Sequence, residues 1–339
     1  MKATHTDTDQ AAAVISRTPA RTAFDNLHNF VGKLIIGQKL LVNRLMIALL
    51  ADGHLLVEGA PGLAKTRAIK ILSAGLDADF HRVQFTPDLL PADLTGTDIY
   101  RPQDGSFAFQ QGPLFHNLVL ADEVNRAPAK VQSALLEAMA ERQITVGRQT
   151  YDLPSLFLVM ATQNPIEQEG TYPLPEAQLD RFLMHVAIHY PGEDEEMEIL
   201  KLARAEAHSD NGPVANEPPQ MSQQHILDAR REVLDIHMSD PLERYILNIV
   251  LATRNPGAYD ELLGGWVEYG ASPRASIALD RCARAHAWLA KRDYVAPEDV
   301  QSIAADVLRH RIILSYEAQA EGISNDRCIT ELLKRIAVP

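Results

Sequence analysis

Residues 55–69 constrain the fold of this chain more than any other segment. An apolar run typical of a buried strand breaks into a Gly/Pro turn, and Lys65 and Thr66 then open a helical pattern. Gly59 and Gly62 let the backbone turn tightly, so that successive N–H groups converge on phosphate oxygens at the positive end of the helix. The segment therefore predicts a phosphate-binding loop.

Each part of this loop has an expected role. Lys65 would reach the β- and γ-phosphates of a nucleotide, and Thr66 would ligate Mg²⁺. Ala64 stands where the general pattern has its last glycine. A plain Gly-Pro turn followed by an exposed lysine is the alternative interpretation. The expected nucleotide contacts are Gly59, Ala60, Pro61, Gly62, Leu63, Ala64, Lys65, Thr66 and Arg67.

Composition narrows the function classes. A length of 339 residues suggests about two domains. The net charge of −13 argues against a general affinity for nucleic acid, although a local basic pore could survive in an acidic protein. Cys282 and Cys328 suffice neither for a disulfide framework nor for a cysteine zinc site. The longest apolar run, residues 45–51, is too short to span a bilayer, and the N-terminus lacks a signal-peptide pattern, so we expect a cytoplasmic protein.

Polar groups follow two more apolar runs, where each predicted strand ends. Asp122 and Glu123 follow residues 116–121, and Asn164 follows residues 156–163. The carboxyl ends of parallel strands form the ligand-binding edge of an open α/β sheet. Asp122 would hold Mg²⁺, usually through water, and Glu123 would polarise the attacking water. The alternatives are a solvated strand end for the acids and an ordinary turn residue for the asparagine.

The order of elements separates an α/β part from a helical part. Residues 1–20 show no sustained period and predict a mobile tail. Signals for strands stop after Pro191, so we predict an α/β core at 21–191 and a helical second domain at 192–339. The expected core strands are 54–58, 81–85, 116–123, 156–164 and 185–189, and the expected helices begin near residues 21, 40, 65, 129, 176, 194, 222, 240, 272 and 297.

Residues 86–113, which contain several prolines and glycines, interrupt the alternation of predicted strands and helices. Within them, 97–100 and 106–109 could pair as a hairpin across Asp104-Gly105, and a long surface loop is the alternative. A DNA-binding element should show clustered Lys or Arg. The region instead has Arg101 as its single basic residue, against Asp88, Asp93, Asp98 and Asp104. This composition favours a protein over DNA as the molecule it contacts.

Five motifs in consecutive order make the chain, over about residues 21–339, resemble the MoxR-type AAA+ ATPases. The first is the loop itself, in which this family normally carries alanine at the sixth place, as Ala64 here. The other four are a Walker B segment at 121–127, a sensor 1 segment at 161–165, an arginine-finger helix at 176–182 and a sensor 2 segment at 270–274. Five ordered matches are more specific than any single motif.

The resemblance implies a P-loop AAA+ core with a five-stranded parallel sheet in the order 5-1-4-3-2, a helical lid and a ring, usually a hexamer. Residues 86–113 would be the helix-2 insert, which projects towards the pore. The helices between about 205 and 255 would include an insertion before sensor 2. Ile36, Gly37 and Gln38 would lie near the adenine.

The same resemblance implies roles around ATP and Mg²⁺, bound between two subunits. Asn164 would orient the attacking water, and Arg181 would reach the γ-phosphate of the neighbouring subunit. Arg274 would act in cis or in trans, which the sequence leaves open. Arg126 is either a competing interface arginine or a surface residue beside the acids. The expected catalytic residues are Glu123, Asn164, Arg181 and Arg274, and the expected metal ligands are Thr66 and Asp122.

By this resemblance, the chain would be an ATP-driven remodelling chaperone. It would work with a von Willebrand factor A domain protein to mature a client complex or insert a metal into it. A nucleic-acid motor is the rival from another class, and the motor subunit of a metal chelatase is close in architecture. A nucleotide-binding scaffold without hydrolysis is disfavoured because every expected catalytic group is present.

Overall fold

The structure is a computed structural model that describes residues 18–103, 105–165, 170–208 and 218–339. Residues 1–17 of the tail predicted at 1–20 lie outside these ranges, and so does Asp104 of the predicted hairpin turn. Among the residues described, no helix is long and apolar enough to cross a bilayer.

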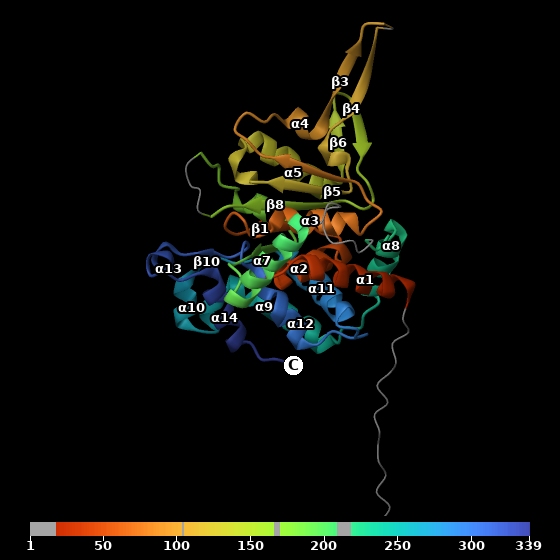
Figure 1. Cartoon of the computed structure of the whole chain (residues 1–339). Coiled ribbons are helices and arrows are strands. Elements are labelled where there is room, and N and C mark those ends of the chain that lie inside the picture. Colours follow the sequence, from red (N-terminus) through yellow and green to blue (C-terminus); the bar gives the residue numbers. More distant parts are fainter. Residues whose placement is uncertain (1–17, 104, 166–169, 209–217) are drawn as a thin grey trace, which may run out of the picture.

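A parallel five-stranded sheet forms the centre of the molecule (Figure 1). Its strands lie in the order β2-β5-β8-β1-β9, which confirms the predicted order 5-1-4-3-2. Every neighbouring pair is parallel. The strands are β1 (Leu55–Glu58), β2 (Phe80–Gln84), β5 (Leu118–Asp122), β8 (Leu158–Gln163) and β9 (Met184–Ala187).

Helices cover both faces of this sheet, so its strands are apolar on both sides. On one face α5 (Ala129–Glu141) packs through its buried stripe on Val119 and Val159. On the other, Leu120 and Met160 contribute to a core shared with α2 (Lys39–Leu50) and α3 (Lys65–Ala74). Figure 1 shows the two helical layers on opposite sides of the sheet.

A buried histidine ties the sheet to α5. The ring of His54 accepts a hydrogen bond from the Val159 N–H at 3.0 Å and lies 3.2 Å from the Met139 carbonyl. Burial lowers the pKa of His54 to about 4, so the ring is neutral at physiological pH. One uncharged side chain thus links the start of β1 with β8 and α5.

The C-terminal part is helical, as predicted, and a short antiparallel pair lies within it. That pair is β10 (Val267–Tyr269) and β11 (Ile313–Leu314). The helix α1 (Pro19–Leu34) packs against this part, and the Phe24 and Trp288 rings meet edge to face at 5.3 Å. The helices are α7 (Glu193–His208), α8 (Gln223–Leu234), α9 (Asp240–Arg254), α10 (Glu261–Trp266), α11 (Pro273–Leu289), α12 (Pro297–Leu308), α13 (Tyr316–Ala320) and α14 (Asn325–Arg335).

The predicted hairpin within residues 86–113 is confirmed. It follows α4 (Pro91–Thr95), consists of β3 (Gly96–Arg101) and β4 (Ser106–Gln111), and protrudes from the body of the molecule (Figure 1). Phe109 anchors its base by stacking on Tyr151 at 4.2 Å. The helix α4 was not predicted.

Two further local elements, both in the core, differ from the prediction. A second hairpin, β6 (Gln143–Val146) with β7 (Gln149–Asp152), was missed because these short, mostly exposed strands show no hydrophobic period. The helix predicted at 176–182 ends early, as α6 (Glu176–Leu179). The chain leaves the helix there because Leu183, just before β9, donates its N–H to the carbonyl of His54, just before β1. Short 3₁₀ turns occur at Pro113–Phe115, Val124–Arg126 and Pro256–Ala258.

Candidate functional site

The carboxyl ends of β1, β5 and β8 bring three of the predicted groups to one edge of the sheet. Lys65 follows β1 through the loop, Asp122 ends β5, and Asn164 follows β8. The Gln163 carbonyl, next to Asn164, accepts hydrogen bonds from Gly59 N–H at 3.3 Å and from Lys65 Nζ at 3.5 Å. The groups thus meet in one place, as the sheet topology requires.

The loop has the backbone that a phosphate cradle needs. A Cβ on Gly59 would lie 2.4 Å from Cγ1 of Ile188, so only glycine fits there. Gly62 has φ +84° and Ala64 has φ +57°, and the alanine bears a strain of about 1–2 kcal/mol for its left-handed conformation. Lys65 Nζ bonds the Gly59 carbonyl across the loop.

The charge environment of Lys65 matches a phosphate ligand beside two acids. Burial lowers the pKa of Lys65 from 10.5, and the carboxylates of Asp122, Glu123 and Glu58 oppose that shift. Thr66 lies in the first turn of α3, directly after the loop, and its hydroxyl and the Asp122 carboxylate are the candidate oxygen ligands. Oxygen ligands of this kind are those that Mg²⁺ prefers, so the residues present fit the expected metal.

The Asp122 carboxylate is held by two side chains. Its Oδ1 accepts a hydrogen bond from Thr162 Oγ1 at 2.6 Å, and its Oδ2 pairs with Arg82 Nη2 at 2.7 Å. The same threonine oxygen accepts from the Glu123 N–H at 2.9 Å. Thr162 therefore fixes the spacing of the two acids, and Arg82 neutralises the first of them.

Glu123 is held in a similar way by two neighbours. Its Oε2 accepts from Gln84 Nε2 at 2.8 Å and from Arg126 Nη1 at 2.9 Å. Arg126, considered above as an interface arginine, thus contacts an acid of its own chain. Arg82 and Gln84 were not predicted as site residues. The available signal was their alternation on β2, which places both on one face of the strand next to β5.

Arg82 is a positive charge on the carboxylate that is expected to hold a divalent cation. Because its side chain is half exposed, the pair contributes no more than about 1 kcal/mol, so Arg82→Ala should raise the affinity for Mn²⁺ by up to roughly fivefold. The measurement is a Mn²⁺ titration followed by electron paramagnetic resonance in the presence of ADP. Arg231→Ala, at a surface pair with Asp228, is the control. Weaker Mn²⁺ binding in Arg82→Ala would show that Arg82 assists the metal.

A cavity of about 260 Å³ lies beside the loop. One wall contains Ile36 and Gln38, which the sequence analysis placed near the adenine. Gly37 between them has φ +76°, and a Cβ there would lie 2.8 Å from Cβ of Pro191. Gln38 Nε2 donates to the His189 carbonyl at 3.0 Å, which fixes this segment against the end of the sheet.

Helix α7 also lines this cavity and was not foreseen as part of the site. Ile199 and Leu202, three residues apart on one helical face, line the cavity with Glu206. Arg67 also lines it, and both of its terminal nitrogens bond the Glu206 carboxylate. The guanidinium of Arg67 therefore joins α3 to α7 at the edge of the cavity.

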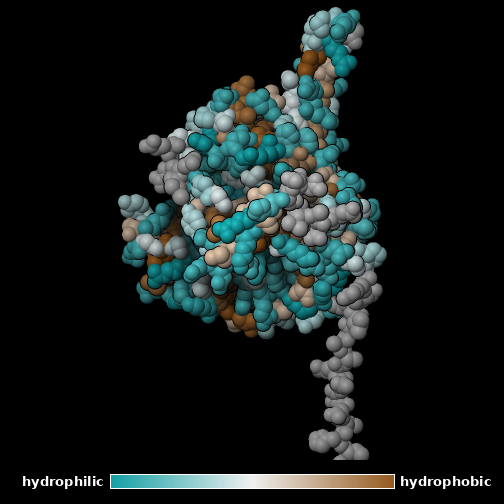
Figure 2. Space-filling model, in the orientation of Figure 1, coloured by the Kyte–Doolittle hydropathy of each residue, from teal (hydrophilic) through white to brown (hydrophobic). Residues whose placement is uncertain are grey.

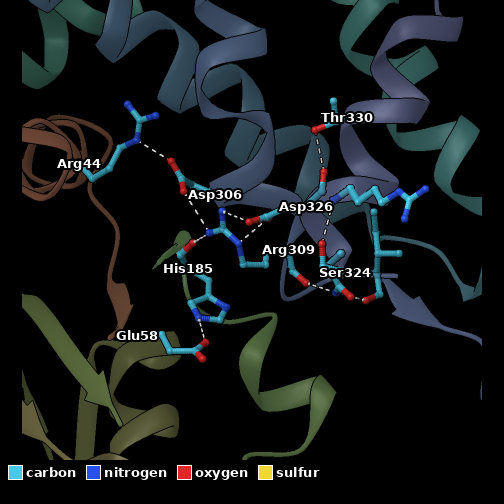
Figure 3. A network of polar contacts seen from close by, with 11 residues as sticks. Arg44, Glu58, His185, Asp306, Arg309, Ser324, Asp326 and Thr330 are labelled. Atoms are coloured by element: carbon cyan, nitrogen blue, oxygen red, sulfur yellow. Dashed lines mark hydrogen bonds and ion pairs between the residues drawn. The ribbon is translucent and has the colours of Figure 1, made fainter. Parts of the chain in front are cut away.

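A polar network runs from the end of β1 to the helical part (Figure 3). Nε2 of His185 lies 2.8 Å from Oε2 of Glu58, the residue before the loop, and this contact lowers the pKa of Glu58. The His185 carbonyl accepts a hydrogen bond from Arg309. Ion pairs continue the network to Asp306, Asp326 and Arg44.

Arg181 and Arg274 lie at the other end of the sheet. The Leu183 N–H, two residues after Arg181, donates to the His54 carbonyl just before β1. The Ile188 N–H donates to the Glu58 carbonyl, at the end of β1 that leads into the loop. Since β1 alone spans roughly 10 Å, neither arginine is close to the loop of its own chain. Both line a cavity of about 340 Å³, here called the arginine cavity, with Arg142, Arg281 and Arg311.

Comparison with known proteins agrees with this geometry. The family model for "ATPase family associated with various cellular activities (AAA)" matches residues 54–184, and an AAA lid domain model matches residues 266–332. A crystal structure of a protein from Cytophaga hutchinsonii, assigned provisionally as an ATPase, superposes with a TM-score of 0.86 at 48% identity, covering 94% of this chain and 96% of that one.

Two curated relatives cover most of the chain. Chaperone MoxR1 of Mycobacterium tuberculosis is 45% identical over 318 residues, covering 91% of this chain and 80% of that protein. The Bacillus subtilis protein YeaC is 42% identical over 322 residues, covering 93% of this chain and 97% of that protein. Similarity at this level through both the sheet and the helical lid means that the chain belongs to the MoxR-type AAA+ ATPases.

Proposed function

We propose that the chain hydrolyses ATP to ADP and phosphate at the carboxyl edge of its sheet. The observation that carries the proposal is the convergence of Lys65, Asp122 and Asn164 at one loop. The adenine would occupy the cavity beside Ile36 and Gln38, and the phosphates would lie along the loop at the start of α3.

The residues divide the work of hydrolysis. Lys65 would exchange its bond to the Gly59 carbonyl for the β- and γ-phosphates. Mg²⁺, held by Thr66 and Asp122, would neutralise phosphate charge. Glu123 would accept a proton from the attacking water, which Asn164 orients. Gln84 and Arg126 both donate to its Oε2, so the proton would go to Oε1.

The site would be completed by a second copy of the chain. Arg181 and Arg274 would serve the nucleotide of a neighbouring subunit, and their shared location at the far end of the sheet supports a role in trans for both. Because each subunit offers the loop on one face and the arginines on another, the contact would be head-to-tail, the kind that generates a ring when the rotation between subunits closes. By family membership that ring would be a hexamer.

The proposed biological role is that of a chaperone-like motor acting on a protein client. The relative from Mycobacterium tuberculosis is named a chaperone. The hairpin β3–β4 supports a protein client, because its exposed Tyr100 and Phe107 form a ring pair at 5.3 Å on a protruding element (Figure 2). A von Willebrand factor A domain protein as partner, and maturation or metal insertion as the outcome, follow from the family resemblance.

Lys65→Ala tests the hydrolytic function directly. Loss of the ammonium group should weaken ATP binding and abolish turnover in a coupled phosphate-release assay, because the phosphates lose a charged ligand in a half-buried site. Lys70→Ala, later on the same helix, should hydrolyse ATP at the normal rate. Equal rates in Lys65→Ala and the parent protein would remove the loop from the mechanism.

The response to DNA tests the class of client. Residues 86–113 contain a single basic residue, so single-stranded DNA at physiological salt should leave the ATPase rate unchanged. The assay compares rates with and without oligonucleotide at two salt concentrations. Salt-sensitive stimulation would instead favour a nucleic-acid motor.

A further inference from the structure

Asp180, adjacent to Arg181 in the chain, joins the arginine-finger turn to the lid. Its Oδ1 accepts a hydrogen bond from Arg311 Nε at 2.8 Å. Its Oδ2 accepts from Ser272 Oγ at 2.9 Å and lies 3.5 Å from Arg274 Nη1. One carboxylate is therefore shared by three lid side chains. Two of them, Ser272 and Arg274, lie at the N-terminus of α11.

Arg311 holds the backbone on both sides of the finger. Its side chain is 3% exposed. Its guanidinium donates to the carbonyls of Asp180 at 3.2 Å, Phe182 at 2.6 Å and Leu183 at 3.2 Å. A buried guanidinium is tolerated where its donors are satisfied in this way. A residue of the lid thus holds the backbone of the turn that presents Arg181.

Ser272 fixes the start of α11 to the same carboxylate. Its hydroxyl caps the helix by accepting the Arg274 N–H at 3.1 Å, and it donates to Asp180. A carboxylate at the positive end of a helix is further stabilised by the helix dipole. Movement of Asp180 would therefore shift the first turn of α11 and Arg274 with it.

We propose that Asp180 is a positioning residue that presents Arg181 and Arg274 together, as one rigid pair, to the nucleotide of the adjacent subunit. The inference rests on the proposed ring with trans-acting arginines. Arg181 lies on the core and Arg274 on the lid, so without a shared anchor their separation would vary with every movement of the lid. Asp180, supported by Arg311, is the contact that couples them.

The variant Asp180→Asn tests this role. It retains the shape of the side chain and a hydrogen-bond acceptor for Ser272, but it loses the charge that attracts Arg274 and Arg311. Displacement of catalytic groups by about 1 Å costs on the order of 10²-fold in rate, so kcat should fall by about that factor. The affinity for ATP should not change, because the loop lies at the opposite end of the sheet. Asp280→Asn, which weakens a partly buried pair with Arg284 on α11, the helix that carries Arg274, is the matched control.

Mixed rings separate positioning from general stability. Glu123→Gln subunits should bind ATP without hydrolysing it, yet they still offer intact arginines to a neighbour. In rings mixed from equal amounts of Asp180→Asn and Glu123→Gln, about one interface in four pairs a competent loop with intact arginines, given head-to-tail contacts. Two nearly inactive proteins should thus regain about a quarter of the parent activity.

A second mixture distinguishes failure of this inference from failure of the ring mechanism. Arg181→Ala mixed with Glu123→Gln should also regain activity if arginines act in trans. Rescue of Arg181→Ala without rescue of Asp180→Asn would overturn the positioning role. Absence of rescue in both mixtures would overturn the trans mechanism and the positioning role with it. If Asp180→Asn does not fold, Ser272→Ala removes the hydroxyl that links Asp180 to α11. Rescue of Ser272→Ala by Glu123→Gln would then support the positioning role, and lack of rescue would overturn it.

Discussion

Arg181→Ala is expected to lose roughly 10³- to 10⁵-fold in ATPase rate per subunit, the range that an arginine supplied to a transferring phosphoryl group contributes. ATP affinity should be nearly unchanged, because the arginine acts on charge that develops in the transition state. It is also remote from the loop of its own chain, since Arg181 Nη1 bonds the Leu136 carbonyl. Steady-state kinetics and nucleotide binding by fluorescence measure the two quantities separately.

Assembly should control activity for the same reason. If the arginine comes from a neighbour, the rate per subunit of the parent protein should fall on dilution as rings dissociate, while that of Arg181→Ala stays uniformly low. Arg231→Ala, at an exposed pair on α8, should behave like the parent protein. A rate per subunit that remains flat through dissociation, as followed by light scattering, would contradict catalysis between subunits.

Glu123→Gln should abolish hydrolysis while leaving ATP bound. A positioned general base contributes about 10²- to 10⁴-fold, and the amide cannot accept the proton from water. The amide still fits the space beside Gln84 and Arg126, so the loop and Asp122, the proposed metal ligand, should be undisturbed. Single-turnover assays with radiolabelled ATP would detect the trapped complex.

The control for this variant is Glu243→Gln, an exposed acid in the first turn of α9, which should turn over normally. Normal turnover in Glu123→Gln would remove Glu123 from the base role. The trapped form also allows a test of the proposed partner, since a ring held in its ATP state should bind a von Willebrand factor A domain protein more tightly than Lys65→Ala does.

The placement of the candidate phosphate-site residues could be predicted because each follows from a local pattern. Gly59 and Gly62 are needed by the backbone of the turn, and the apolar runs ahead of Asp122 and Asn164 place both at strand ends. Parallel strands then bring these ends together without further information. The pairing of β3 with β4 likewise agrees with the two short runs, 97–100 and 106–109, that flank the Asp104-Gly105 dipeptide in the sequence.

Other parts of the site were invisible to pattern because they join segments remote in sequence. Arg82 lies 40 residues from Asp122, and Arg67 lies 139 residues from Glu206. Neither pair shares a helix or a turn, and each depends on which strand or helix becomes a neighbour. The sequence supplies these charges, but it does not state their partners.

The sequence alone determined the form of the candidate phosphate loop, the placement of the two acids and the asparagine at the strand ends, and the division into a sheet-containing core and a helical lid. Tertiary structure alone decided where Arg274 lies. Its motif is compatible with a role in cis or in trans, and the packing of α11 against the finger turn, through Asp180, sets it beside Arg181. The physical reason is that a local pattern specifies how a segment folds, whereas long-range packing specifies what that segment touches.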